Sequence, residues 1–380
     1  MTRIGIIGTG FVADLYMRSL ETVQGLDLIG AYDLRGARLS QFCGHWAVTG
    51  FDTRDALLAA IGPGGILLNL TNPSAHCEIS KAGLSAGCHV YSEKPLAMRM
   101  DHASELHALA SEKGLMLASA PCSFLGEAAQ TIGAALRADV AGKPRLIYAE
   151  LDDDFIPQAP YARWQSESGA SWPAGDEFRV GCTLEHAGYY LTWLIALFGS
   201  VRTVVAASGG QVSDQLPVDD PAPDFSVATL FFESGVVARL TCSIIAPHDH
   251  ALRIICDKGV IELDEAWNNA ARVRFRRRFT LRRRLVNAPV ARRLRLPGET
   301  HPKVGRWGSA SMNFMLGVAE MADAIAQDRP PRMSAELALH LTEVTLAIQT
   351  AGETTGAQVM QTRCDPIEPM PWAQRLKGAL

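Results

Sequence analysis

The first 120 residues alternate between short apolar runs and longer amphipathic stretches. Apolar runs of strand type occupy residues 4–7, 26–32, 66–70, 89–92 and 115–120. Stretches with helical spacing lie between them, at residues 37–46, 55–60, 75–86 and 101–113. Unbroken apolar runs are typical of parallel strands that are buried on both faces. This order predicts a doubly wound parallel α/β sheet with crossover helices. We expect six strands in it, one more than the five runs located here.

Beyond residue 121 the pattern changes to a succession of strands. After a helical stretch at 125–138, strand patterns occupy residues 145–151, 201–207, 225–232, 236–245, 252–256 and 260–263. Short polar turns between successive strands favour a largely antiparallel sheet. Helical stretches at 311–327 and 335–351 come last. We therefore expect a Rossmann domain at 1–121 and an α+β domain for substrate binding and oligomerisation at 122–380.

The composition of the 380 residues is that of an ordinary globular protein, with 48% hydrophobic and 20% charged residues. A net charge of −4 gives no general attraction to nucleic acid or to anionic membranes. No apolar run reaches transmembrane length, and the chain enters its first strand at once, which leaves no room for a signal peptide. The eight cysteines show neither a C-x-x-C pair nor the spacing of a zinc site. We expect a cytoplasmic protein with reduced cysteines and no bound metal.

The most informative motif follows the first strand directly. Gly8, Gly10 and Ala13 fill the three small positions of a dinucleotide-binding turn. Gly8 permits a tight turn, Gly10 leaves room for a pyrophosphate against the backbone, and Ala13 lets the next helix pack closely on the sheet. We expect that helix to start near Phe11, so that its free N–H groups and positive dipole end face the phosphates.

An acidic residue ends the second strand at the expected distance from this turn. Asp33 lies 20 residues after Ala13, where a carboxylate accepts hydrogen bonds from the ribose hydroxyls of the cofactor. The carboxylate repels a 2′-phosphate, whereas Arg35, two residues on, is able to pair with one. These residues predict NAD as the cofactor, with NADP less favoured.

Two further polar segments follow strands of the same predicted sheet. Thr71-Asn72-Pro73 comes after the third strand and Glu93-Lys94-Pro95 after the fourth. Ligands of doubly wound sheets bind outside the carboxyl ends of the strands. The glycine turn, Asp33 and these two segments therefore line one crevice.

These residues resemble the Gfo/Idh/MocA oxidoreductases, a family that includes glucose-fructose oxidoreductase and inositol dehydrogenase. The resemblance covers nearly the whole chain and rests on the glycine turn, on Thr71-Asn72-Pro73 with His76, and above all on Glu93-Lys94-Pro95. It implies that Lys94 reaches both the nicotinamide ribose and the substrate, and that the Lys94–Pro95 bond is cis. It also implies an open-faced, mostly antiparallel second sheet through which copies pair into homodimers or homotetramers.

The motifs and the resemblance together give a set of residues expected to contact the cofactor. They are Gly8, Thr9, Gly10, Phe11, Val12, Asp33, Leu34, Arg35, Thr71, Asn72, Pro73, His76, Glu93 and Lys94.

The other signature of the family is a helix with an Asp followed by a His four residues later. Aligning this chain on Gly199 at the helix end puts Glu185 at the acid position and Tyr189 at the histidine position. Some sugar ketoreductases of the family resemble this chain in having tyrosine there. Residues four apart share a helix face, and His186 borders that face, so His186 stays a competitor for proton transfer. A phenol with a pKa of about 10 is a poor base, and we expect the ammonium of Lys94 to lower that pKa.

Candidate substrate contacts flank this helix in sequence. Trp164 and Trp172 lie in the loop before it, where they either stack on the apolar C–H face of a sugar or plug the protein beneath the loop. His301 and Arg306 precede a late helix and are expected to close the pocket from the other side.

A dense basic run lies between these segments. It consists of Arg272, Arg274, Arg276, Arg277, Arg278, Arg282, Arg283, Arg284, Arg292, Arg293 and Arg295. Such a run is either a solvated face or a contact for an anionic substrate group or an acidic polymer.

The sequence as a whole predicts an NAD-dependent oxidoreductase that transfers a hydride between the nicotinamide and a hydroxyl or keto carbon of a sugar or nucleotide sugar. One alternative is an NAD-dependent glycosidase that oxidises a sugar carbon transiently, eliminates the aglycone and re-reduces the product. The other is a sensor that binds NAD or sugar without catalysis. Lys94 with a phenol or imidazole nearby argues against the sensor. The sugar, the carbon and the physiological direction are left open.

Overall fold

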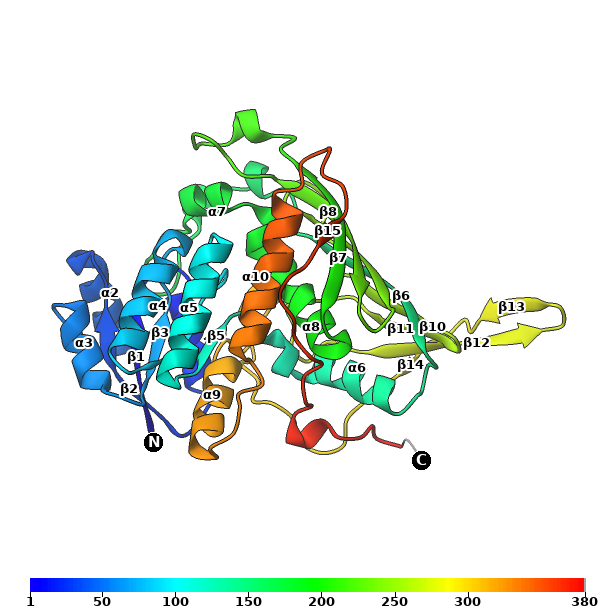
Figure 1. Ribbon diagram of the computed structural model, residues 1–380, viewed down its shortest axis with the longest axis horizontal. Coiled ribbons are helices and arrows are strands. Elements are labelled where there is room, and N and C mark those ends of the chain that lie inside the picture. The colour runs from blue at the N-terminus through cyan, green and yellow to red at the C-terminus, as the bar shows by residue number, and fades with distance from the viewer. Residues whose placement is uncertain (379–380) are drawn as a thin grey trace.

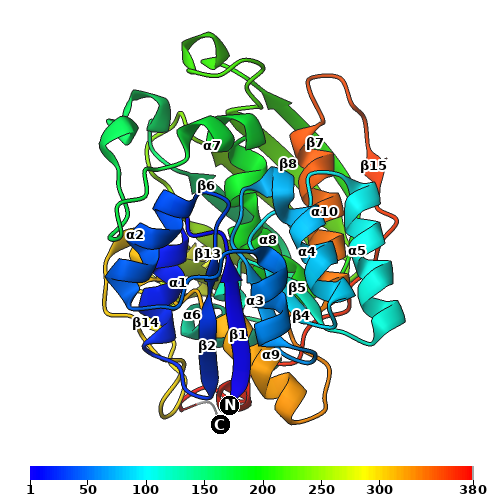
Figure 2. The same ribbon diagram turned by 90° about the vertical axis from the view of Figure 1, so that its left-hand side faces the viewer.

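The computed structural model describes residues 1–378, and its N-terminal part is a parallel sheet of five strands. The strands are β1 Thr2–Ile7, β2 Leu26–Tyr32, β3 Ile66–Asn69, β4 His89–Ser92 and β5 Leu117–Ser119, in the order β2-β1-β3-β4-β5. The crossover helices are α1 Ala13–Leu20, α2 Gly36–Trp46, α3 Arg54–Ile61, α4 His76–Ser85 and α5 Met100–Lys113. Figure 2 looks onto this part, with helices in front of and behind the strands. The doubly wound architecture predicted from the apolar runs is confirmed.

The prediction of six strands is wrong within the described residues. After α2 the chain approaches β2 again, but it makes only an isolated bridge between Gly50 and Ala31. Only a few residues separate α2 from α3 there. A segment this short pairs at one point and then turns away.

The second sheet contains the six predicted strands and additional ones. The predicted strands appear as β6 Pro144–Asp152, β7 Val201–Gly209, β8 Phe225–Phe232, β9 Val237–Ser243, β10 Leu252–Cys256 and β11 Gly259–Leu263. The additional strands are β12 Arg274–Leu281, β13 Arg284–Asn287, β14 Arg292–Arg293 and β15 Gln358–Val359. The order is β13-β12-β11-β10-β6-β9-β8-β7-β15, with β14 on β12, and only β6 and β9 pair in parallel. The predicted, mostly antiparallel sheet is therefore confirmed.

Helices cover one face of this sheet. They include α6 Glu127–Arg137, α7 Ala174–Val180, α8 Gly188–Phe198, α9 Leu316–Ala326 and α10 Ala335–Gln349. In Figure 1, α8 and α10 lie between the N-terminal sheet and the large sheet, so α10 contributes to the join between the two parts.

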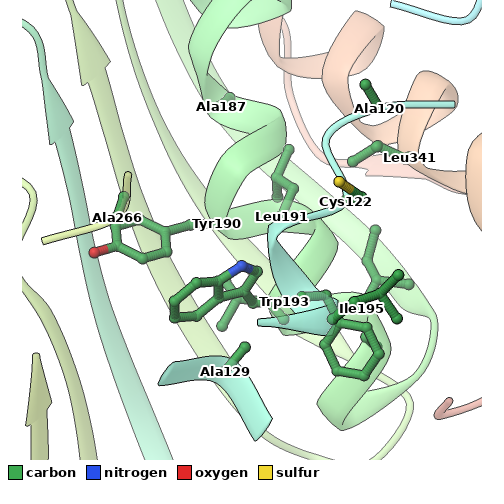
Figure 3. Packing of buried hydrophobic residues seen from close by; sticks show 14 of the residues in the cluster. Ala120, Cys122, Ala129, Ala187, Tyr190, Leu191, Trp193, Ile195, Ala266 and Leu341 are labelled. Carbon is green, nitrogen blue, oxygen red and sulfur yellow. The ribbon is translucent and has the colours of Figure 1, made fainter. Parts of the chain in front are cut away.

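The core beneath α8 is aromatic. Tyr190 and Trp193 are completely buried, and their rings meet edge to face with centroids 5.6 Å apart. Figure 3 shows both rings packed between α8 and the strands. The indole nitrogen of Trp193 donates to Ser123 Oγ at 2.8 Å, which satisfies its polar atom. Removing a buried ring of this size costs about 3–5 kcal/mol, so this core holds α8 rigidly over the sheet.

The strands β12 and β13 form a long hairpin that projects away from the rest of the molecule in Figure 1. Most of the predicted basic run lies on this hairpin and on β14. Leu281 and Leu285 near its tip are also exposed.

All eight cysteines are free thiols, as predicted. Among the described residues, no helix is both long and apolar enough to cross a membrane.

Candidate active site

A cleft of about 860 Å³ lies where the carboxyl ends of β1, β3 and β4 face the second part of the chain. Gly10, Asn72 and Lys94 line it from the parallel sheet, and Glu185 and Tyr189 from the other side. Three of the four segments predicted to share one crevice thus line it directly. The fourth, Asp33, touches the same turn through Thr9 and Arg35.

The two glycines of the first turn have different roles. Gly8 has a φ of +95°, and a Cβ there would come within 2.5 Å of the carbonyl oxygen of Leu70. Gly8 is therefore required by the fold, since an L side chain would be both strained and clashing. A Cβ on Gly10 would meet no atom within 4 Å, although the residue lines the cleft. The space beside Gly10 is open to the cleft, so the turn leaves room for the phosphates of a dinucleotide.

Asp33 is held firmly at the end of β2. One carboxylate oxygen accepts from the backbone N and the hydroxyl of Thr9, at 2.9 and 3.0 Å, and the other accepts from Arg35 Nε at 3.2 Å. Burial raises the pKa of Asp33, but these hydrogen bonds outweigh burial and lower it below the usual value. Asp33 is therefore ionised at neutral pH. Thr9 is fully buried and Leu34 is 90% exposed, so neither side chain lines the cleft.

A buried polar network, which sequence reasoning missed, ties the glycine turn to the second part of the chain. The guanidinium of Arg38 donates to the carbonyl oxygens of Thr9 and Ser168, both at 2.6 Å. Ser168 in turn donates through its backbone N and its hydroxyl to Asp14, each at 2.7 Å. The loop that contains Ser168 therefore closes over the turn between β1 and α1. No short motif signals this contact, because its partners are more than 120 residues apart.

The two strand-end segments enter the cleft largely as predicted. Asn72 and Pro73 line it, and the side chain of Asn72 donates to Asp176 at 2.6 Å. The Lys94–Pro95 bond is cis, as expected from the resemblance.

His76 does not reach the cleft, contrary to the prediction that it contacts the cofactor. It is completely buried, with Nδ1 2.6 Å from the carbonyl oxygen of Pro95 and Nε2 2.9 Å from that of Thr71. The imidazole therefore joins the two strand-end segments from beneath. His76 can therefore influence a bound cofactor only by holding these two segments in position.

Lys94 is the central cation of the cleft. Its ammonium pairs with the carboxylate of Glu185. Burial lowers the pKa of Lys94, but Glu185 and then the neighbouring Tyr189, Glu177 and Glu93 raise it well above its usual value. Lys94 is therefore positively charged at any working pH.

Glu177 on α7 is a further acidic group that sequence reasoning missed. Its burial and the adjacent Glu185 raise the pKa of Glu177 well above its usual value. This raised pKa favours the neutral form of Glu177 beside the Lys94–Glu185 pair. Three groups, from the segment after β4, from α7 and from the turn before α8, thus form one hydrogen-bonded acid–base cluster.

The helix register predicted from Gly199 brings Glu185 and Tyr189 to the same wall. A π-helical turn, Thr183–Ala187, precedes α8 and carries Glu185 and His186, and all three of Glu185, His186 and Tyr189 line the cleft. We expected Lys94 to lower the pKa of Tyr189, but the pKa is raised overall. Burial raises this pKa well above 10, and the opposing effect of Lys94 is the smaller one because Glu185 pairs with its charge. Tyr189 is a neutral phenol at neutral pH.

His186 is neutral for a different reason. Burial lowers its pKa to about 3, and the charges of Lys94 and His250 act in the same direction. Its Nδ1 lies 3.6 Å from Oδ2 of Asp153, whose own pKa is raised to about 6 by burial. An imidazole with so low a pKa is a weak proton acceptor, which favours Tyr189 over His186 for proton transfer.

The two tryptophans of the preceding loop both line the cleft. Trp164 and Trp172 meet edge to face with centroids 5.2 Å apart, and Trp172 also contacts Tyr161 and Phe178. Both predicted roles therefore apply. One side of the aromatic group lines the cleft, and the other side packs against Phe178 of α7.

Two predicted substrate contacts lie elsewhere. His301 is buried beside Trp372, and Arg306 is exposed and faces Glu167 at 3.6 Å; neither lines the cleft. Their position in sequence, shortly before a helix, did not reveal that the intervening loop runs outside the pocket. No arginine of the basic run lines the cleft either, because the run lies on the hairpin and β14.

Comparisons with known proteins agree with this geometry. A UDP-N-acetylglucosamine 3-dehydrogenase of Acidithiobacillus ferrooxidans is 27% identical over 157 residues, which are 41% of this chain and 47% of that protein. A D-glucoside 3-dehydrogenase of Escherichia coli is 35% identical over 121 residues, which are 30% of this chain and 33% of that protein. These alignments span about half the length of the curated relatives or less.

The fold itself matches over the whole length of solved structures. The WlbA dehydrogenase of Bordetella pertussis, in a complex with NADH and UDP-GlcNAcA, superposes with a TM-score of 0.71 at 18% identity. That match covers 95% of this chain and 98% of that one. Residues 2–120 match the family model described as an oxidoreductase family with an NAD-binding Rossmann fold, and residues 129–262 match its C-terminal domain. With both of its parts matched in order, this chain belongs to the Gfo/Idh/MocA family of oxidoreductases.

Proposed function

We propose that this protein is an NAD-dependent dehydrogenase or ketoreductase that interconverts a hydroxyl and a keto group on a neutral sugar. The observation that carries the proposal is that the cleft brings Lys94 and Tyr189 together with the dinucleotide-binding turn. A permanent cation and a phenol beside the cofactor segments are the groups that such a reaction requires.

The residues present fit a bound NAD. The open space at Gly10 and the free N–H groups at the start of α1 suit the pyrophosphate. The ionised Asp33 suits the ribose hydroxyls and disfavours a 2′-phosphate, so we expect NAD to bind more tightly than NADP. The nicotinamide, when bound, supplies or accepts the hydride.

The side chains of the chain then account for the proton and the charge. Lys94 stabilises the negative charge that develops on the substrate oxygen as its C–O bond changes order. Tyr189 gives its proton to that oxygen in reduction, and in the opposite direction its phenolate takes the proton back. Glu185 holds the ammonium in place from behind.

Charge in the cleft indicates the class of substrate. Its second wall carries Asp153, Asp154, Asp176 and Glu185, together with Trp164, Trp172 and Trp267. Glu177 also lines this wall, but its raised pKa favours the neutral acid, so it adds no charge. Carboxylates accept hydrogen bonds from sugar hydroxyls, and indole rings pack on apolar C–H faces. A diphosphate would be repelled by this wall, and the two arginines that line the cleft, Arg35 and Arg38, lie on the side of Asp33. These features support a neutral sugar or glycoside over a nucleotide sugar.

The substrate class is tested by a panel of neutral glycosides, acidic sugars and UDP-sugars with NAD and with NADP. Reaction is followed by the nicotinamide absorbance and, in parallel, by release of aglycone. We expect neutral glycosides with NAD to give the highest kcat/KM. Turnover of UDP-sugars alone would contradict the neutral substrate, and aglycone release without net NADH would contradict the dehydrogenase.

The proton-transfer residue is tested with the substrate that this panel identifies. Tyr189→Phe should lower kcat by about 100-fold while changing the Kd of NADH less than threefold, because only the transition state needs the transfer. His186→Ala should lower kcat less, about tenfold or below. If His186→Ala abolishes turnover while Tyr189→Phe retains it, the imidazole is the proton-transfer group.

A further inference from the structure

Three potential metal ligands meet at the end of β6, next to the cleft. Asp153 follows β6, and His248 and His250 lie in the loop before β10. One carboxylate oxygen and one ring nitrogen from each imidazole lie within 4.8 Å of one another. The expectation of no bound metal rested on cysteine spacing, which this set of ligands does not use.

A second carboxylate lies on the far side of both imidazoles. Glu265 Oε1 is 3.5 Å from Nδ1 of His250, and Glu265 Oε2 is 3.9 Å from Nε2 of His248. The other nitrogen of His248, Nδ1, is 3.9 Å from Oδ1 of Asp153. Histidines that bind a metal commonly donate their second N–H to a carboxylate, which fixes the ring and raises its basicity, and Glu265 is placed for this role toward His250.

The cluster contains a polar atom without a partner. His250 is 1% exposed, and its Nε2 is buried without a hydrogen-bond partner among residues 1–378. Since Nδ1 of His250 faces Glu265, Nε2 is the nitrogen available to an ion. A buried, unpaired ring nitrogen is unfavourable in the empty protein, and a metal ion would satisfy it.

The surrounding structure holds these side chains in place. The hydroxyl of Tyr190 donates to the carbonyl oxygen of His250, and the ring of Trp267 lies edge to face on the imidazole of His250 at 4.6 Å. The backbone N of Trp267 donates to Glu265 at 2.9 Å, which orients that carboxylate. Loop ligands are thus supported by the rigid core beneath α8.

We propose that Asp153, His248 and His250 bind one divalent transition-metal ion, with Zn²⁺ as the best match. Two imidazole nitrogens and one carboxylate are the ligands of many mononuclear sites, and such a set leaves a coordination position open. Ligand atoms on a tetrahedral zinc lie about 3.4 Å apart, given bond lengths of about 2.0–2.1 Å. The three ligand atoms lie within 4.8 Å of one another, with 3.9 Å between His248 Nδ1 and Asp153 Oδ1, so binding would draw these side chains closer together.

The proposed ion lies behind the wall of the cleft. Asp153 and Trp267 line the cleft, whereas His248 and His250 do not. While one oxygen of Asp153 faces His248, the other faces Nδ1 of His186, which also lines the cleft. The ion would therefore fix the carboxylate beside His186 and shape the substrate side of the cleft.

The proposal is tested by direct binding, so its outcome is independent of the proposed oxidoreductase activity. Chelator-treated protein is titrated with Zn²⁺ by calorimetry and with Co²⁺ by visible absorption. We expect one ion per chain. His248→Ala and Asp153→Asn should each weaken binding about 100-fold or more, and Glu265→Gln about 10- to 100-fold.

His107→Ala is the matched control, because His107 also faces a carboxylate, Glu336 at 3.6 Å, but stands outside this cluster. Binding by this variant should be unchanged. His248 is half-exposed, so His248→Ala keeps the fold even where a buried substitution does not. The proposal is overturned if the intact protein binds no ion stoichiometrically, or if His248→Ala and Asp153→Asn bind within threefold of the wild type.

Discussion

The two walls of the cleft are built in different ways. The cofactor wall consists of strand ends of one parallel sheet, each occupied by a short contiguous motif such as Gly8–Ala13 or Glu93–Pro95. The substrate wall gathers single residues from the loop after β6, α7, the π-helical turn, the start of α8 and the segment around Trp267. The first wall follows from sequence order, whereas the second exists only once distant segments pack together.

The difference extends to the electrostatics of the two walls. On the cofactor wall, hydrogen bonds outweigh burial, and the pKa of Asp33 is lowered. On the substrate wall, burial outweighs the nearby cation, and the pKa values of Glu177 and Tyr189 are raised. A motif residue next to backbone donors therefore keeps its expected charge, while a residue enclosed by side chains does not.

The largest effect is expected from removing the cation where the two walls meet. Lys94→Met should lower kcat by about 1,000-fold, because the developing charge on the substrate oxygen loses its stabilising partner. The Kd of NADH should change less than fivefold. Steady-state kinetics and fluorescence titration of NADH measure the two quantities.

Lys81→Met is the control for this experiment. Lys81 is an exposed lysine of α4 that pairs with Glu105, so its loss should leave kcat unchanged. A Lys94→Met enzyme with more than a tenth of wild-type turnover would remove Lys94 from catalysis and leave it a cofactor-wall residue only.

The two walls should differ in how their functions depend on pH. Oxidation requires Tyr189 to take a proton, and its pKa lies above 10 among Lys94, Glu93, Glu185 and Glu177. Below that pKa the phenolate fraction rises tenfold per pH unit, so kcat/KM for oxidation should rise about 100-fold from pH 7 to 9. NADH binding should stay constant over this range, because Asp33, with its lowered pKa, is already ionised.

This profile is measured in both directions and with Tyr189→Phe, whose dependence on pH should be flatter. A plateau reached between pH 6 and 7 would indicate an imidazole as the acceptor and would contradict the assignment to Tyr189.

Substitutions in the glycine turn test whether cofactor binding can be lost without loss of fold stability. Gly10→Val should weaken NADH binding at least tenfold with an unchanged Tm, because its side chain would enter the open space of the cleft. Gly8→Ala should lower the Tm instead, since strain at a φ of +95° costs about 1–3 kcal/mol before the clash with Leu70 is added. Each variant serves as the control for the other, and equal losses of Tm would contradict the distinction.

The smallest effect is expected from the charge at the end of β2. Asp33→Asn should shift the ratio of Kd for NADP to Kd for NAD by about 5- to 10-fold toward NADP. Removing one charge repulsion at a partly solvated site is worth about 1 kcal/mol, and Arg35 is released to meet a phosphate. Calorimetric titration with both cofactors measures the ratio, and tighter binding of NADP by the wild type would overturn the choice of NAD.

The sequence by itself determined the order of elements and the cofactor wall. Apolar runs marked the five parallel strands, and the residues after them lie at one edge because parallel strands share a direction. The predicted register likewise brought Glu185 and Tyr189 to one wall of the cleft, because residues four apart on a helix lie near one another, although a π-helical turn carries Glu185. These are local or topological constraints, which a linear pattern contains.

Only the tertiary structure decided which residues complete the substrate wall and what charge they carry. Asp153, Glu177 and the pair His248–His250 lie up to 97 residues apart, with no motif linking them, and they meet because the second sheet brings β6 beside the loop before β10. His301 and Arg306 do not line the cleft, because their loop passes outside it, and this too depends on the tertiary structure. Burial raises the pKa of Tyr189 and lowers that of His76. The degree of burial depends on all the residues packed around a side chain, and those neighbours are known only once the chain has folded.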